Sequence, residues 1–235
     1  MEPTAVAGLG FAHFLTQTDG VGKLVLIVLL LLSMASWYLI VTRAIANTLA
    51  QKRADAFLAG FWDAPSLRDV SAALVARPID NAFAELAAQA LRAAGDGESD
   101  GAQKLAAAGG LGEFLTRVLR NGIDQEAARV EHGLTVLASA GSAAPYVGLF
   151  GTVWGIYHAL VQIGLSGQGT LDKVAGPVGE ALIMTALGLA VAIPAVLAYN
   201  AFNRRNRMWL ARLDAFAHDL YVLTTVGPAK TTSPR

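Results

Sequence analysis

The sequence contains no cysteine, and only 15% of its 235 residues are charged. The absence of cysteine excludes a disulfide framework, thiol catalysis and metal sites built on thiolates. A soluble domain of this length needs more charge to cover its surface, so the low charge and the 54% of hydrophobic residues indicate a membrane protein. The 18 basic and 18 acidic residues balance, which argues against a general nucleic-acid-binding protein.

Three long apolar stretches run from about Leu24 to Val41, from about Thr135 to Ile163 and from about Val178 to Phe202. About 20 apolar residues cross a bilayer as a helix, so each stretch is long enough to span it. A cleavage site at residues 33–35 is a loose alternative for the first stretch. However, Lys23 is the only basic residue ahead of it, whereas a secretory signal begins with a positive segment, so we expect a retained helix.

Basic residues are distributed unequally between the two sides of these spans. Residues 1–23 and the loop 164–177 contribute only Lys23 and Lys173. The positive-inside rule therefore predicts an outer N-terminus and a cytoplasmic C-terminus. The basic residues near the membrane ends on the opposite side are Arg43, Lys52, Arg53, Arg117, Arg120, Arg129, Arg204, Arg205, Arg207 and Arg212.

The predicted fold is all-α, an integral membrane protein with three transmembrane helices and long helices that extend into the cytoplasm. Helix breaks are expected near Pro65, Pro78 and Gly109-Gly110, and a flexible linker at 95–101. From Glu113 no strong breaker occurs before Gly133, so the second transmembrane helix is expected to extend below the membrane. The expected segments are an outer N-terminus (1–22) with a short interfacial helix at 8–18, spans at 23–42, 134–163 and 178–202, a cytoplasmic helical domain (43–133), an outer loop (164–177) and a basic cytoplasmic tail (203–235).

Small residues line one side of the second and third spans. Gly148, Gly151 and Gly155 recur at helical spacing in the second, and Gly188 lies among alanines and threonines in the third. Small residues let membrane helices approach closely, so both helices are expected to be interior or inter-subunit helices. The first span is rich in Leu, Ile and Val and is expected to face lipid. The glycine run lacks the Lys-Ser or Lys-Thr of a phosphate-binding loop, and the histidines lack metal spacing, so no cofactor or metal is expected.

Glu180 is the only acidic residue within the three apolar stretches. A charge at the bilayer centre costs at least ~2.5–3.5 kcal/mol, so such residues usually mark ion or proton paths. Because Glu180 follows Pro177 closely, it can instead reach water or stabilise the helix N-terminus. Thr152 and Thr185 place hydroxyl groups on the two small faces. These hydroxyls either carry a water chain or bind a partner helix, or they bond back to the backbone of their own helix.

Two segments, PYVGLFGTVWGI at 145–156 and EALIMTALGLAVAIPAVLAYN at 180–200, resemble the signature core of the ExbB/TolQ/MotA family of proton-driven motor subunits. The loop LDKVAGPVG at 171–179 leads into the acid as it does in that family, and the resemblance covers roughly residues 110–205. By motif, Glu180 matches the family's pore carboxylate, and Thr152 and Thr185 match its two pore threonines.

The resemblance implies a pentamer in the inner membrane of a Gram-negative bacterium. The second and third helices of each subunit would line a pore that holds the transmembrane helices of an ExbD-type dimer. Proton flow would then act through a TonB-type protein to energise outer-membrane transporters of iron–siderophore complexes and vitamin B12. Such a subunit contacts membrane lipid and is not an enzyme.

Three alternatives remain open from the sequence. A TolQ-like subunit of the Tol–Pal envelope system shares nearly all of the motif. A passive scaffold would use the small faces only for assembly, and a Glu180→Gln change would then be silent. A membrane enzyme or substrate transporter is disfavoured, because the sequence has neither polar clusters nor inverted hydropathy repeats.

Overall fold

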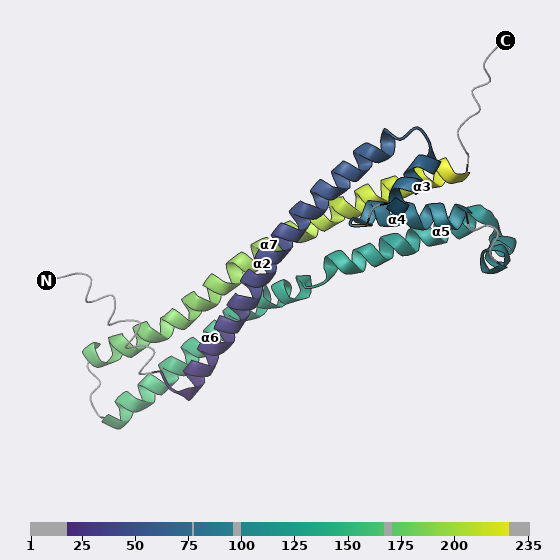
Figure 1. Ribbon diagram of the computed structural model, residues 1–235. Coiled ribbons are helices and arrows are strands. Elements are labelled where there is room, and N and C mark those ends of the chain that lie inside the picture. The colour runs from purple at the N-terminus through teal and green to yellow at the C-terminus, as the bar shows by residue number, and fades with distance from the viewer. Residues whose placement is uncertain (1–17, 77, 96–99, 167–170, 226–235) are drawn as a thin grey trace, which may run out of the picture. The chain divides into compact units, whose positions relative to one another are not determined.

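The computed structural model describes residues 18–76, 78–95, 100–166 and 171–225, and every regular element in these ranges is a helix. Three stretches, Gly20–Trp62, Gly110–Leu165 and Gly176–Thr225, are long and apolar enough to cross a membrane. The predicted all-α class with three membrane spans is therefore confirmed. The helices, labelled in Figure 1, are α2 (Gly20–Trp62), α3 (Leu67–Ala76), α4 (Ala82–Gly95), α5 (Asp100–Glu131), α6 (Leu134–Ser166) and α7 (Leu171–Thr225).

The short helices α3 and α4 begin at polar caps that follow two prolines. α2 ends before Pro65 and α3 ends before Pro78, as expected from the loss of a backbone donor at proline. Ser66 Oγ accepts the backbone N–H three residues later at 3.3 Å, and Asn81 Oδ1 accepts the N–H of Ala84 at 2.9 Å. Each cap satisfies a donor that the first helical turn leaves without a partner.

Two glycines interrupt the helical path between the linker and the second span. Gly110 has φ 81° and ψ 164° inside α5, and Gly133 has φ 81° between α5 and α6. Residues with a side chain rarely adopt this region, whereas glycine enters it at little cost. The break expected at Gly109-Gly110 is thus present at Gly110, and α6 begins anew at Leu134.

The third long helix exceeds its predicted bounds at both ends. α7 begins at Leu171, inside the expected loop 164–177, and continues to Thr225, through most of the expected tail. Pro177 lies inside the helix, which membrane helices tolerate when other groups satisfy the freed carbonyl. The expected interfacial helix at 8–18 lies almost entirely outside the described residues, as does most of the linker at 95–101.

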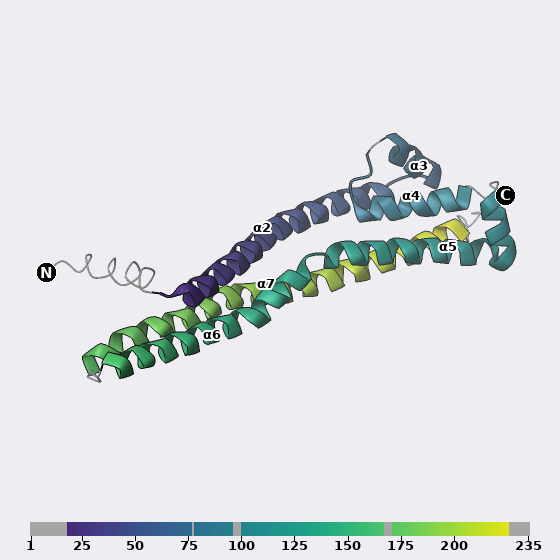
Figure 2. The ribbon, with the colours of Figure 1, turned by 90° about the horizontal axis from the view of Figure 1, so that it is seen from below.

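The chain divides into two compact units. Residues up to Thr42 and Gly133–Phe202 form one, here called the span unit. Arg43–His132 and the chain from Asn203 form the other, here called the second unit. In the span unit α6 and α7 lie side by side along their length, as Figures 1 and 2 show.

The span unit has a narrow core of small and aliphatic side chains. Val25 and Leu29 of α2 pack with Ala144 of α6 and with Met184 and Ala192 of α7. α2 also packs Leu32, Leu39 and Ile40 against a second cluster of the span unit, and many of its other large apolar side chains are exposed. Its exposed large side chains within the span are Leu24, Ile27, Leu30, Leu31, Met34, Trp37, Tyr38 and Val41.

The second unit contains a larger, aromatic core. Phe83 is fully buried, and its ring lies 5.2 Å from that of Trp209 and 5.5 Å from that of Phe216. Leu213 and Leu220 of α7 join the same cluster. Burial of each large apolar side chain contributes about 1.5–3 kcal/mol, so this core holds the last part of α7 as a helix.

The C-terminal end of α5 is held by two polar side chains of the second unit. The Arg43 guanidinium donates to the carbonyls of Arg129, Val130 and His132. Asn206 Nδ2 donates to the Val130 carbonyl at 2.8 Å. The last carbonyls of a helix have no partner within it and carry partial negative charge, so a cation is favoured there.

Candidate functional site

Thr152 on α6 is buried, and its hydroxyl oxygen lies within hydrogen-bond distance of three other oxygens. These are Thr185 Oγ1 at 2.6 Å, the Ala181 carbonyl at 3.0 Å and the Gly148 carbonyl at 3.1 Å. A hydroxyl has one proton to donate and two lone pairs, so it cannot donate to all three at once. The bond to Gly148 is the local one weighed from the sequence, and the other two contacts join α6 to α7.

Glycine backbones allow this approach of the two helices. A Cβ placed on Gly148 would lie 2.6 Å from the Met184 carbonyl oxygen and 3.1 Å from Gly188 Cα. A Cβ placed on Gly188 would lie 2.6 Å from the Ala144 carbonyl oxygen. Since ordinary contacts to a Cβ begin at 3.4 Å, no side chain fits at either position without movement of the helices.

The other two predicted packing glycines lie along the same contact. A Cβ on Gly155 would meet the Ala181 Cβ at 3.1 Å. A Cβ on Gly151 would meet Val25 Cγ1 at 2.9 Å and Met184 Cβ at 3.2 Å. Gly151 therefore faces both α2 and α7, and all four glycines lie where helices of the span unit approach one another.

Glu180 lies on α7 directly before Ala181, whose carbonyl approaches Thr152, and its side chain is half-buried. At ~100° per residue, Glu180 and Thr185 are about 140° apart around the helix axis. The acid therefore lies beside the hydroxyl pair along the chain, but on another side of α7. One backbone step separates Glu180 from the carbonyl that Thr152 approaches.

A further polar contact in the span unit was not predicted from the sequence. Asp19 Oδ1 accepts the backbone N–H of Gly22 at 2.8 Å, and Asp19 Oδ2 accepts the indole N–H of Trp154 at 2.6 Å. An acid just before an apolar helix is a signal for an N-cap and could have identified the first bond. The second joins residues far apart in the chain, so no local pattern indicates it.

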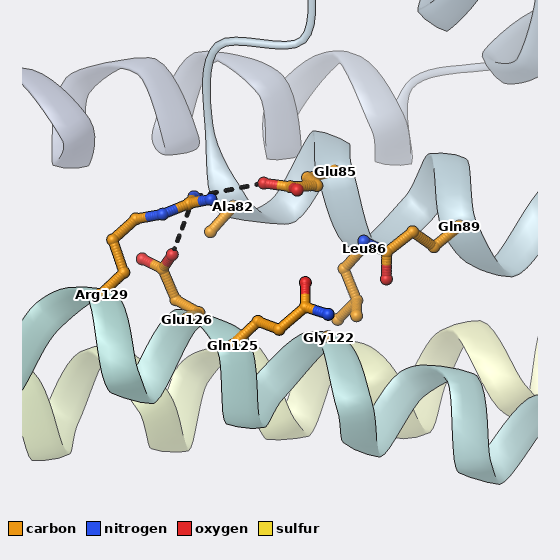
Figure 3. Close-up of a pocket in the computed structure, with 8 residues that line it drawn as sticks. All are labelled: Ala82, Glu85, Leu86, Gln89, Gly122, Gln125, Glu126 and Arg129. Atoms are coloured by element: carbon orange, nitrogen blue, oxygen red, sulfur yellow. Dashed lines mark hydrogen bonds and ion pairs between the residues drawn. The ribbon is translucent and has the colours of Figure 1, made fainter.

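A charged cluster in the second unit has the character of a structural contact. Figure 3 shows Arg129 between Glu85 and Glu126, with N–O distances of 3.2 and 3.3 Å. Glu126 is buried and also accepts the indole N–H of Trp209 at 2.9 Å. The adjacent cavity measures about 10 Å³, room for a single water molecule at most, so it is too small for a substrate.

The segments that form this site lie within a region that matches a known protein family. The profile of the MotA/TolQ/ExbB proton channel family matches residues 80–215. The "Biopolymer transport protein ExbB" of Xanthomonas campestris pv. campestris (strain B100) is 41% identical over 235 residues, 95% of this chain and 91% of that protein. The protein of the same name from Neisseria meningitidis (strain Z2491) is 46% identical over 198 residues, 84% of this chain and 89% of that protein.

A relative with a different name is also similar along nearly the whole chain. The "Tol-Pal system protein TolQ" of Pseudomonas aeruginosa (strain PAO1) is 35% identical over 224 residues, 95% of this chain and 96% of that protein.

Proposed function

Because the chain belongs to the MotA/TolQ/ExbB proton channel family, we propose that it is an ExbB-like subunit of a proton-driven motor. It works with ExbD-type and TonB-type proteins, and the complex uses the proton motive force to energise outer-membrane transport of iron–siderophore complexes and vitamin B12. The two ExbB proteins compared above are 41% and 46% identical to this chain, against 35% for the TolQ protein, which favours this branch of the family.

The single observation that carries the proposal is the hydroxyl pair beside the acid. Thr152 and Thr185 lie 2.6 Å apart, and either can donate the proton in their hydrogen bond. Glu180, the lone acid of the three apolar stretches, directly precedes Ala181, whose carbonyl Thr152 approaches. A carboxyl group takes up and releases a proton, and hydroxyls both accept and donate one, so these groups have the chemistry that a proton path needs, with Glu180 on another side of α7 from Thr185.

The proposed assembly is a pentamer in the inner membrane of a Gram-negative bacterium, with an outer N-terminus and a cytoplasmic C-terminus. The charge asymmetry of the sequence supports this orientation. Large apolar and aromatic side chains on α6 and α7 remain exposed in the single chain, which supports further contacts with other subunits or lipid. They include Tyr146, Leu149, Phe150, Val153 and Tyr157 on α6 and Leu182, Leu189 and Ile193 on α7.

The second candidate is a TolQ-like subunit of the Tol–Pal envelope system. The 35% identity to TolQ over 95% of this chain supports it. The two candidates share the proposed proton chemistry and differ in the partner that receives the energy. A deletion strain separates them, because loss of siderophore uptake and loss of envelope integrity are different phenotypes.

The test is deletion of the gene in its own host, with siderophore-dependent iron uptake as the measurement. We expect wild type to restore uptake and Glu180→Gln, at equal abundance in the membrane, to fail. Glu113→Gln is the matched control, since Glu113 makes an exposed i,i+4 ion pair with Arg117 in the second unit. Restoration by Glu180→Gln would mean that this acid is structural, and intact uptake with a weakened envelope would indicate the TolQ-like role.

A further inference from the structure

Asp19 uses both oxygens of its carboxylate to join two helices of the span unit. One oxygen accepts the N–H of Gly22 and so caps α2, and the other accepts the indole N–H of Trp154 on α6. Hydrogen bonds to a charged acceptor are roughly twice as strong as neutral ones. A single side chain thus fixes the start of α2 to a point two residues beyond Thr152.

The start of α2 packs against the same part of α6 and α7 that holds the threonine pair. Val25 Cγ1 lies 2.9 Å from the position of a Cβ on Gly151, the residue before Thr152. Met184, the residue before Thr185, is buried in one cluster with Val25 and Leu29. Its Cε lies 3.4 Å from the position of a Cβ on Gly22, inside the turn that Asp19 caps.

The surroundings of Asp19 keep its carboxylate charged at neutral pH. Burial raises the pKa of the Asp19 carboxyl, but the hydrogen bonds from Trp154 and Gly22 and the charges of His158 and Lys23 outweigh it. The net result is a pKa below the ordinary value of 3.8. Lys23 belongs to α2 and His158 to α6, while on α7 the titratable residue nearest in sequence to Met184 is Glu180, one turn earlier.

We propose that Asp19 is a positioning residue for the threonine pair. Its bond to Trp154 holds α6 against α2 and Met184, and this three-helix contact sets the distance at which Thr152 meets Thr185. The proposal concerns the geometry of the site; its consequence for transport rests on the proposed function. Asp19→Asn keeps the shape but has one acceptor oxygen in place of two, and Trp154→Phe removes the indole donor together with part of the ring system.

A disulfide between α6 and α7 measures the helix approach without reference to transport, because the chain has no cysteine of its own. Gly155→Cys with Ala181→Cys places two Cβ atoms 3.1 Å apart, slightly closer than the ~3.5–4.5 Å that a disulfide spans, beside the carbonyl that Thr152 approaches. We expect this cysteine pair to oxidise at least about threefold more slowly in native membranes with Asp19→Asn or Trp154→Phe. Each variant loses one net hydrogen bond that holds the helices together, and this fold-change corresponds to the free energy of such a bond. Because both changes break the same hydrogen bond, the variant that combines Asp19→Asn with Trp154→Phe should oxidise no more slowly than either single variant.

A second cysteine pair serves as the control. Gly141→Cys with Val196→Cys tests a contact where the Cβ position lies 3.5 Å from Val196 Cα, several turns from Asp19. Its oxidation rate should not change in either variant. An unchanged rate at positions 155 and 181, or equal slowing of both pairs, would overturn the positioning role.

The transport measurement then separates this inference from the proposed function. In the deletion strain we expect Asp19→Asn to lower siderophore-dependent uptake several-fold at unchanged membrane abundance. Slower cross-linking with unchanged uptake would overturn the role of Asp19 in the proton site. If wild type itself fails to restore uptake, the proposed function fails, and the cross-linking rates still decide whether Asp19 positions the pair.

Discussion

A methyl group at the crossing of α6 and α7 is expected to open the threonine pair. In Gly148→Ala the new Cβ would lie 2.6 Å from the Met184 carbonyl oxygen, and in Gly188→Ala it would lie 2.6 Å from the Ala144 carbonyl oxygen. Ordinary contact begins at 3.4 Å, so the helices must separate by about 0.8 Å. The obstructing atoms belong to the backbone and cannot rotate away as a flexible side chain can.

The loss of stability and the change in the Thr152–Thr185 distance both follow from this displacement. Overpacking of a closely fitted contact costs about 1–3 kcal/mol, which equals or exceeds the ~1 kcal/mol that alanine gains over glycine in a helix. Thr152 and Thr185 lie within one turn of the crossing, so a separation of about 0.8 Å takes their 2.6 Å contact to about 3.4 Å. O–H···O hydrogen bonds are usually ~2.5–3.0 Å long, so the bond would be strongly weakened.

Thermal unfolding of the purified protein in detergent measures this cost. We expect a lower midpoint for Gly148→Ala and Gly188→Ala, and loss of siderophore-dependent uptake at equal membrane abundance. Gly164→Ala is the matched control, since Gly164 lies in α6 and a Cβ there meets no atom within 4 Å. A midpoint for Gly148→Ala that equals or exceeds that of Gly164→Ala would refute the close approach of the two helices.

Two further changes test the second unit by the same unfolding measurement. Glu126→Ala leaves the Trp209 indole N–H without its acceptor and should lower the free energy of unfolding by about 1–3 kcal/mol. Glu113→Ala breaks only an exposed i,i+4 ion pair and should lower it by at most ~0.5 kcal/mol. Equal effects would contradict a stabilising role for the buried Glu126. Arg43→Gln should lower the free energy of unfolding by about 1–2 kcal/mol, because the carbonyls at the end of α5 lose a charged donor. Arg43→Lys should not restore it fully, since an ammonium lacks the planar fork of donors, and full recovery would show that charge alone suffices.

The sequence predicted the elements of the fold better than their ends. Apolar runs located the three spans, and proline or glycine located the breaks at Pro65, Pro78 and Gly110. Residues after Phe202 read as a basic tail because arginines are concentrated at its start. As far as Thr225 this segment is helical, and Leu213, Phe216, Ala217 and Leu220 repeat at helical spacing and pack in the core of the second unit. That periodicity was present in the sequence but competed with the charge pattern.

The pairing of residues across the site could not be read from either helix alone. Helical spacing places Gly148 and Thr152 on one face of α6, and Thr185 and Gly188 on one face of α7, but it does not fix how the two faces are offset along their axes. Small residues recur about once per turn along both faces, so a shift of one turn, about four residues, in one direction would still place a small residue, Ala192, opposite Gly148.

Hydroxyl pairing removes this degeneracy. After a shift of one turn, Thr152 and Thr185 would each face a residue without a polar side chain and could bond only to backbone. In the observed register they meet at 2.6 Å while Gly148 meets Gly188, so close packing and hydrogen bonding select the same offset. In an apolar span a hydrogen bond between helices adds to packing, which is the other main source of association. The contact that brings the two hydroxyls together for the proposed proton path is therefore also one that sets the register of the two helices.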